Sequence, residues 1–174
     1  FGLSDVKQIG VSAVDKISNN ISELSKDLDS WRWVDYLIFF SKSISSTVNK
    51  ALISSGALDY LKLSRNQMLY ELEIWNKLTA KEMEWIKGET EGSALFGDAI
   101  GPIEWGSFQE ALEACQRPKK EGGGCSNSKR SQVVADLVKS IKNPPHSLSD
   151  SPAWISWAEE KYLGTSITCN KVDG

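Results

Sequence analysis

Carboxylates are the only side chains suited to catalysis that this chain carries in quantity. It has one histidine, His146, and no Cys-x-x-Cys pair among its three cysteines. Two carboxylates held ~5–10 Å apart can act as acid and base in glycoside hydrolysis, provided that burial raises the pKa of one of them. The candidates for such a pair share one irregular segment: Glu89, Glu91, Asp98 and Glu104. Acidic residues also keep surface loops hydrated, so a carboxylate hydrolase is the third of three hypotheses.

The cysteines offer a disulfide more readily than a metal site. Three independent reduced thiols are the favoured interpretation. The alternative is a small ring closed by Cys115 and Cys125, which flank a glycine-rich segment, and this would leave Cys169 free. We expect Cys125 to be exposed, with basic neighbours that favour its thiolate. One histidine and three cysteines provide almost no ligands for zinc, and no nucleotide motif is present, so we expect no metal and no cofactor.

The balance of charge argues against nucleic acid as a partner. The chain has 20 Lys and Arg residues against 23 Asp and Glu residues, a formal net charge of -3. Bulk attraction to a polyanion is therefore excluded. A local basic cluster could still contact an acidic protein, and we assign its members to a candidate binding surface: Lys119, Lys120, Lys129 and Arg130.

Seven tryptophans are the unusual feature of the composition. Most of them must fill the core of a small helical protein. A core location for all seven is the favoured interpretation. Trp31 and Trp33 cannot both face one core from one helix, however, and one or two exposed indoles would mark a partner surface or a membrane interface. The aromatic residues assigned to this candidate surface are Trp31, Trp33, Phe39, Phe40 and Trp105.

A regular apolar seam predicts a long amphipathic helix over residues 3–28. Its members alternate at spacings of four and three: Gly10, Val14, Ile17, Ile21, Leu24, Leu28 and Trp31. This heptad pattern favours packing within a bundle or against a second copy of the chain. The polar face balances lysines with acidic residues, whereas a membrane anchor is usually cationic.

The remaining chain predicts further helices and two long loops. Residues 3–55 read as a helical hairpin that ends before a left-handed Gly56, and residues 64–87 as a third helix capped by Ser64. A loop over 88–106 and a mobile loop over 118–131 interrupt the shorter helices of 107–163, where Ser107 and Ser151 are the expected caps. Gly164 ends the last helix and opens a tail over 164–174. No segment shows the alternation of a strand.

These patterns predict a single all-α domain over residues 1–174. We expect an antiparallel bundle of about six helices, three long N-terminal and three shorter C-terminal, with long Gly- and Pro-rich loops. The leading functional hypothesis is a non-enzymatic scaffold that binds another protein through its loops and tryptophan-containing surfaces. The alternative is a membrane-active or apolar-ligand-binding protein that uses the N-terminal amphipathic helix. The first residue is Phe1, which favours a processed or secreted protein.

Overall fold

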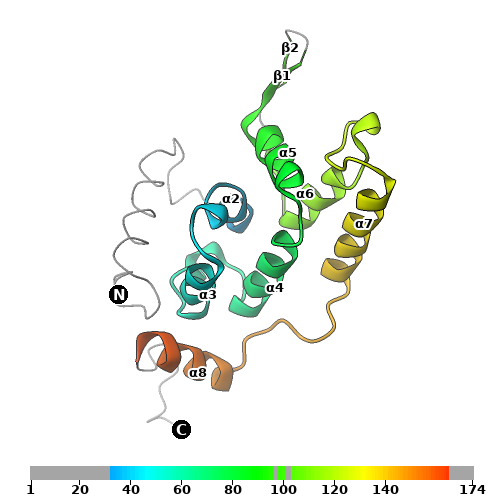
Figure 1. Ribbon diagram of the computed structural model, residues 1–174. Coiled ribbons are helices and arrows are strands. Elements are labelled where there is room, and N and C mark those ends of the chain that lie inside the picture. The colour runs from blue at the N-terminus through cyan, green and yellow to red at the C-terminus, as the bar shows by residue number, and fades with distance from the viewer. Residues whose placement is uncertain (1–31, 96–97, 101–102, 165–174) are drawn as a thin grey trace. The chain divides into compact units, whose positions relative to one another are not determined.

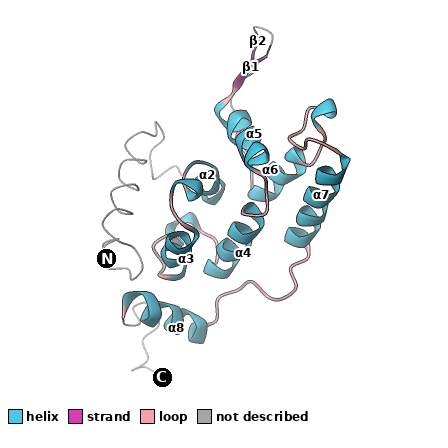
Figure 2. Ribbon diagram, in the orientation of Figure 1, coloured by secondary structure: helices cyan, strands magenta, loops and turns pink. Residues whose placement is uncertain are grey.

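The computed structural model describes residues 32–95, 98–100 and 103–164, which are mostly helical (Figures 1 and 2). The α-helices in this part are α2 (Trp33–Phe39), α3 (Ser46–Ser54), α4 (Arg65–Trp75), α5 (Ala80–Glu91), α6 (Phe108–Cys115), α7 (Ser128–Lys142) and α8 (Pro152–Leu163). Three 3-10 turns lie between them: η3 (Ser41–Ser43), η4 (Asp59–Leu61) and η5 (Lys119–Glu121). The expected helix over 3–28 falls outside the described residues.

The chain groups into two compact units. Unit 1 takes the residues up to Tyr70 and those from Leu148 onward, and unit 2 takes Glu71–Ser147. Helix α4 begins in unit 1 and continues into unit 2. The expected antiparallel bundle and the single domain over the whole chain stay predictions.

Unit 1 has a core built from α2, α3 and α8. Helix α3 packs against α8, and Leu37, Ile53 and Ala158 are fully buried. A buried polar chain ties α2 to α3: the Tyr36 hydroxyl donates to Asn49 Oδ1, and Asn49 Nδ2 donates to the Ser41 carbonyl at 2.8 Å. Because each of these buried polar groups has a partner, the network fixes how the two helices meet instead of weakening the core.

One continuous helix was expected where the structure has α2, η3 and α3. Serine side chains explain the interruption, since a serine hydroxyl competes for the carbonyls that a helix would use. Ser41 donates to the Leu37 carbonyl at 2.7 Å, and Ser43 donates to the Phe40 carbonyl at 2.7 Å. Ser45 then accepts from the Val48 amide and starts α3 as a new helix.

Unit 2 is built around α6, which packs against both α5 and α7. Its buried residues include Ile86, Leu112 and Val134, one from each of the three helices. Trp75, at the end of α4, meets Phe108 edge to face, with ring centroids 5.9 Å apart. A fully buried tryptophan of this kind fills the volume that a small helical core leaves open.

The expected helix over 64–87 is two helices, α4 and α5. A capping box separates them: the Glu82 amide donates to Thr79 Oγ1 at 3.2 Å, and the Thr79 amide donates to Glu82 Oε1 at 3.1 Å. This reciprocal pair satisfies amides that a helix start leaves open, so a new helix begins at residue 80. Helix α5 then continues through Gly88, where the sequence predicted an end, to Glu91.

Part of the expected loop over 88–106 is a short hairpin, so the prediction of no strand is wrong here. Strand β1 (Ser93–Leu95) pairs antiparallel with β2 (Asp98–Ile100), in a register that sets Ala94 opposite Ala99. The chain returns to α5 after the hairpin, where the Ile103 amide donates to the Glu89 carbonyl at 3.0 Å. A strand of three residues is too short to show an alternation of apolar and polar residues, so the sequence pattern did not predict β1 and β2.

The predicted helix caps are confirmed. Ser64, Ser107 and Ser151 each accept a hydrogen bond from an amide three residues on, at the starts of α4, α6 and α8. Gly56 and Gly164 have positive φ angles of 93° and 82°, as a residue that follows a helix in the left-handed conformation requires.

Candidate functional site

Two aromatic residues of the predicted binding surface lie in the core of unit 1. Trp33 stacks on Tyr36 with ring centroids 5.3 Å apart, and Tyr36 meets Phe40 at 5.4 Å. All three are buried, so Trp33 and Phe40 do not form an exposed binding surface. Phe39 is half-buried, and Trp31 lies outside the described residues.

Trp105 is also buried, in unit 2. Its indole N–H donates to Thr90 Oγ1 at 2.8 Å, and the Thr90 hydroxyl donates to the Ile86 carbonyl at 2.7 Å. This chain of bonds attaches the segment after the hairpin to α5. Trp105 is therefore a packing residue and offers no indole to a partner.

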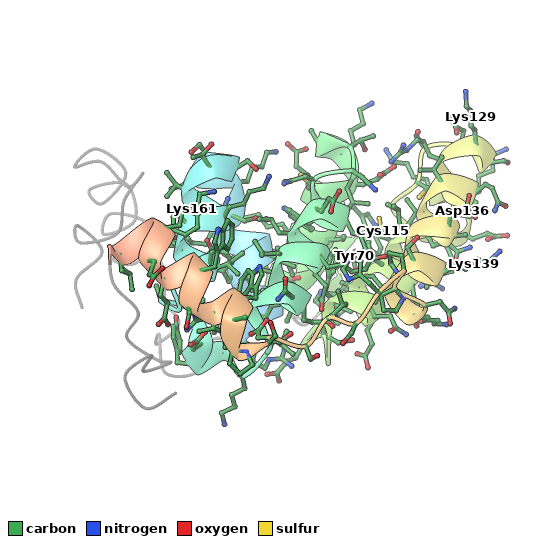
Figure 3. All side chains as sticks on the ribbon, turned by 90° about the horizontal axis from the view of Figure 1, so that it is seen from below. Tyr70, Cys115, Lys129, Asp136, Lys139 and Lys161 are labelled. Carbon is green, nitrogen blue, oxygen red and sulfur yellow. The ribbon has the colours of Figure 1, made fainter. Side chains whose placement is uncertain are left out.

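The basic cluster divides into exposed lysines and one paired arginine. Lys119, Lys120 and Lys129 are exposed, and Lys129 projects from the start of α7, with Asp136 and Lys139 further along the same helix (Figure 3). Arg130 instead forms a bidentate ion pair with Glu82: its Nη2 lies 2.7 Å from Oε1 and its Nε 3.0 Å from Oε2. The arginine is occupied by a structural role, so only the lysines remain from the predicted basic surface.

None of the three candidate carboxylates whose exposure the structure describes, Glu89, Glu91 and Glu104, has the full burial that would raise a catalytic pKa. Glu91 and Glu104 are exposed and Glu89 is half-buried. Glu91 Oε1 lies 3.9 Å from Lys87 Nζ, with both side chains about half exposed. Asp98 lies in β2. Nothing in the described residues supports the hydrolase hypothesis.

The two described cysteines are free thiols and both are fully buried. The expectation that Cys125 is exposed is therefore wrong. Burial raises the pKa of the Cys125 thiol, and the nearby Glu82 carboxylate raises it further, against the weaker opposite effect of Arg130. Basic neighbours in the sequence thus do not produce a reactive thiolate here.

Helix α8 carries the aromatic surface that the sequence analysis did not assign. Trp157 is 54% exposed, and Lys161 Nζ lies 5.1 Å from the centroid of its ring. Trp154, half-buried, lies one turn earlier, with its ring centroid 6.4 Å from that of Trp157. We call Trp154, Trp157 and Lys161 the α8 face; Lys161 is labelled in Figure 3.

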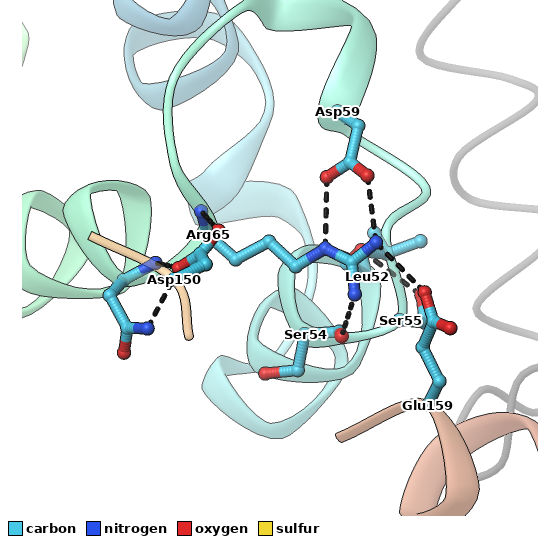
Figure 4. A network of polar contacts seen from close by, with 8 residues as sticks. Leu52, Ser54, Ser55, Asp59, Arg65, Asp150 and Glu159 are labelled. Carbon is cyan, nitrogen blue, oxygen red and sulfur yellow. Dashed lines mark hydrogen bonds and ion pairs between the residues drawn. The ribbon is translucent and has the colours of Figure 1, made fainter. Parts of the chain in front are cut away.

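A buried charge explains why Trp157 points outward. Glu159 is 1% exposed and lies 2.9 Å from the Arg65 guanidinium in unit 1 (Figure 4). Successive helical residues are ~100° apart, so Glu159 and Trp157 lie on nearly opposite sides of α8. Hydrophobicity alone would place the tryptophans of α8 in the core. The buried ion pair instead places Glu159 toward the core and leaves Trp157 on the solvent side. No local pattern in the sequence indicates this ion pair, because Arg65 and Glu159 are 94 residues apart in the chain.

Comparison of this chain with protein-family models, with curated proteins and with solved structures finds no match. Within the described ranges, no group of three or more histidine, cysteine, aspartate or glutamate side chains is arranged to hold a metal ion. None of the helices described here is both long enough and apolar enough to cross a bilayer.

Proposed function

We propose that this chain is a non-enzymatic helical module that binds another protein, with the α8 face as its main contact surface. The observation that carries the proposal is the exposure of Trp157. Tryptophan is one of the residue types that most often contribute a large share of the binding energy at protein interfaces. Here the buried Glu159 holds the helix that presents it, so the indole is displayed from a fixed element.

The side chains of the α8 face indicate which groups the surface of the partner protein needs. The indole of Trp157 needs an apolar pocket, and Lys161 beside it needs a carboxylate at the rim of that pocket. The Nζ atom of the same lysine also lies 5.2 Å from the ring centroid of Tyr162, which is buried, so the ammonium group lies near two aromatic rings. The exposed lysines 119, 120 and 129 of unit 2 would form a second, weaker surface for an acidic partner.

Contact with a membrane surface is the alternative, because tryptophan and lysine also occur together at bilayer interfaces. Glu160, however, is exposed next to Lys161 on α8, and an interfacial helix usually carries an excess of positive charge. The amphipathic segment over 3–28 lies outside the described residues, and its self-association or membrane binding remains a prediction from the sequence.

Replacing Trp157 with alanine is expected to weaken partner binding by roughly 30-fold or more, equal to about 2 kcal/mol, as for other interface hot spots. Tyr60→Ala is the matched control, because Tyr60 is also aromatic, lies in unit 1 and is 50% exposed. The wild-type chain, Tyr60→Ala and Trp157→Ala are each immobilised. A protein that the first two retain and Trp157→Ala does not is purified, and its dissociation constant is then measured for all three chains.

Helical content by circular dichroism should be the same in the three chains, since neither substitution removes a buried group. An equal dissociation constant for wild type and Trp157→Ala would overturn the proposal. So would flotation with neutral or anionic liposomes that depends on Trp157, because that result would assign the α8 face to a membrane.

A further inference from the structure

Two cysteines of unit 2 meet although they come from different kinds of structure. Cys115 is the last residue of α6, and Cys125 follows the glycine-rich segment that comes after it. Both residues have no exposed surface. The sequence predicts a mobile loop here, but Gly123, Gly124 and Cys125 are all buried. The loop is thus folded back onto the end of the helix.

Main-chain hydrogen bonds hold the loop in this position. The Gly124 amide donates to the Cys115 carbonyl at 3.1 Å, and the Cys125 amide donates to the Arg117 carbonyl at 3.2 Å. In return, the Lys119 amide donates to the Cys125 carbonyl at 2.9 Å. The entropy of closing a loop between the two cysteines is therefore already lost in the reduced, folded chain.

The sulfur atoms lie at the centre of this arrangement. The Cys125 thiol donates to the Cys115 carbonyl at 3.1 Å, so the Cys125 sulfur lies against the main chain of the other cysteine. A Cβ atom on Gly124 would lie 2.7 Å from Cys115 Sγ and 3.0 Å from the Trp85 ring. Only glycine at 124 lets the main chain pass this close to the sulfur, so the residue types of the loop match the contact.

We propose that Cys115 and Cys125 are a dithiol site that closes to an intramolecular disulfide by exchange with a low-molecular-weight disulfide such as oxidised glutathione. In the first step one cysteine loses its proton, and its sulfur displaces one glutathione thiolate from the oxidant. In the second step the other cysteine loses its proton, and its sulfur displaces the remaining glutathione. Two protons and two electrons thus pass from the pair to glutathione, which leaves as two thiols.

The surroundings of the pair control the rate of this exchange. Burial raises the pKa of both thiols, and the carboxylate of Glu82 raises it further. A buried neutral thiol is a poor nucleophile, so the first step requires the loop to open. We expect slow oxidation of the native chain, and faster oxidation when a low concentration of urea increases local opening.

The test measures how strongly folding favours the disulfide. The full-length chain is equilibrated in glutathione redox buffers, once in native buffer and once in urea that unfolds it, and the products are quenched with acid. Because the cysteines are ten residues apart, the chain-entropy relation predicts a disulfide that stabilises the fold by about 100-fold in the unfolding equilibrium constant. The effective concentration of the two thiols should accordingly be about 100-fold higher in the native chain than in the unfolded chain.

Cysteine variants identify the bond. Wild type and Cys169→Ser should both lose two hydrogen atoms in intact mass and give a peptide that links Cys115 to Cys125. Cys115→Ala and Cys125→Ala should not form this product. A mixed disulfide with glutathione as the stable end product, a link to Cys169, or an effective concentration no higher in the native than in the unfolded chain would each overturn the proposal.

Discussion

Replacing Arg65 with methionine is expected to lower the free energy of unfolding by about 3–5 kcal/mol, the cost of leaving a buried charge without its partner. The guanidinium is almost fully buried in unit 1, and its hydrogen bonds there include those to Asp59, Glu159 and Ser54 (Figure 4). Its Nε and Nη2 donate to Asp59 at 3.0 and 2.7 Å, Nη2 also donates to Glu159 at 2.9 Å, and Nη1 donates to the Ser54 carbonyl at 3.3 Å.

These bonds join four segments that are distant in the sequence. Arg65 opens α4, Asp59 opens η4, Ser54 ends α3, and Glu159 lies within α8. Burial opposes the charge of Arg65, but the hydrogen bonds that the guanidinium donates to Asp59 and Glu159 outweigh burial and raise its pKa. The arginine therefore stays charged, and its removal leaves the Glu159 carboxylate buried with that partner missing.

The start of α4 is anchored a second time, through the main chain. Asp150 accepts from the amides of Arg65 and Asn66 at 2.7 and 3.0 Å, and from Asn66 Nδ2 at 2.8 Å. Ser64 Oγ donates to the Leu148 carbonyl at 2.6 Å. These bonds remain in Arg65→Met, so we expect a weakened unit 1 in which the segment before α8 still meets α4.

Two control variants compare the stability contributed by the buried Arg65–Glu159 ion pair with that of the more exposed Arg65–Asp59 ion pair. Asp59 is about half exposed, so Asp59→Asn should cost less than about 1 kcal/mol. The double variant Arg65→Met/Glu159→Met removes both buried charges and should be more stable than Arg65→Met alone. Urea unfolding followed by circular dichroism measures all four chains. A double variant less stable than Arg65→Met would contradict this account of the pair.

Local signals in the sequence predicted several helix ends, whereas contacts between distant residues determine which face of a helix is buried. Ser64, Ser107 and Ser151 act within one helical turn, so their roles follow from the neighbouring residues alone. The Thr79–Glu82 capping box is equally local and was readable, but an apolar stripe that continues from α4 into α5 concealed it.

The candidate site could not be predicted in the same way. Its orientation depends on Glu159 pairing with Arg65, which lies 94 residues away in the chain. A helical projection treats each helix alone and assigns tryptophan to the core and glutamate to the solvent. The same limitation affects the loop before α7, because Gly123 and Gly124 indicate flexibility in a sequence but permit close packing in a folded chain.

Unit 2 depends in the same way on one buried carboxylate, Glu82. Arg130→Met is expected to lower the free energy of unfolding by about 3 kcal/mol or more, because Glu82 is 1% exposed and loses both bonds from the guanidinium. Arg130 Nη2 also donates to the Lys77 carbonyl at 3.4 Å, at the turn before α5. Lys129→Met is the matched control; it removes an exposed neighbouring charge on the same helix and should change stability by less than about 0.5 kcal/mol.

The pH dependence of stability tests the charge of Glu82 directly. Burial acts to raise the pKa of this carboxyl, but the hydrogen bonds from Arg130 and Thr79 outweigh burial and lower the pKa below its ordinary value of 4.5. A carboxyl with a lowered pKa in the folded state stabilises the fold above its unfolded-state pKa, and this contribution is lost as the pH falls through the folded-state pKa. Glu82→Gln should therefore be less stable than wild type at neutral pH.

The difference between the two chains should stay constant down to about pH 5 and shrink below about pH 4.5. At that pH the unfolded wild type begins to take up a proton at Glu82, whereas the folded wild type, with its lower pKa, does not, and glutamine cannot bind this proton in either state. Urea midpoints at several pH values measure it. In Arg130→Met the hydrogen bonds that lower the pKa of Glu82 are reduced to those from Thr79, so this pKa is higher than in wild type and the carboxyl takes up its proton at a higher pH. The stability of that variant relative to wild type should then improve as the pH falls. A difference between wild type and Glu82→Gln that is the same at all pH values would show that the loss comes from packing, with no part for the charge.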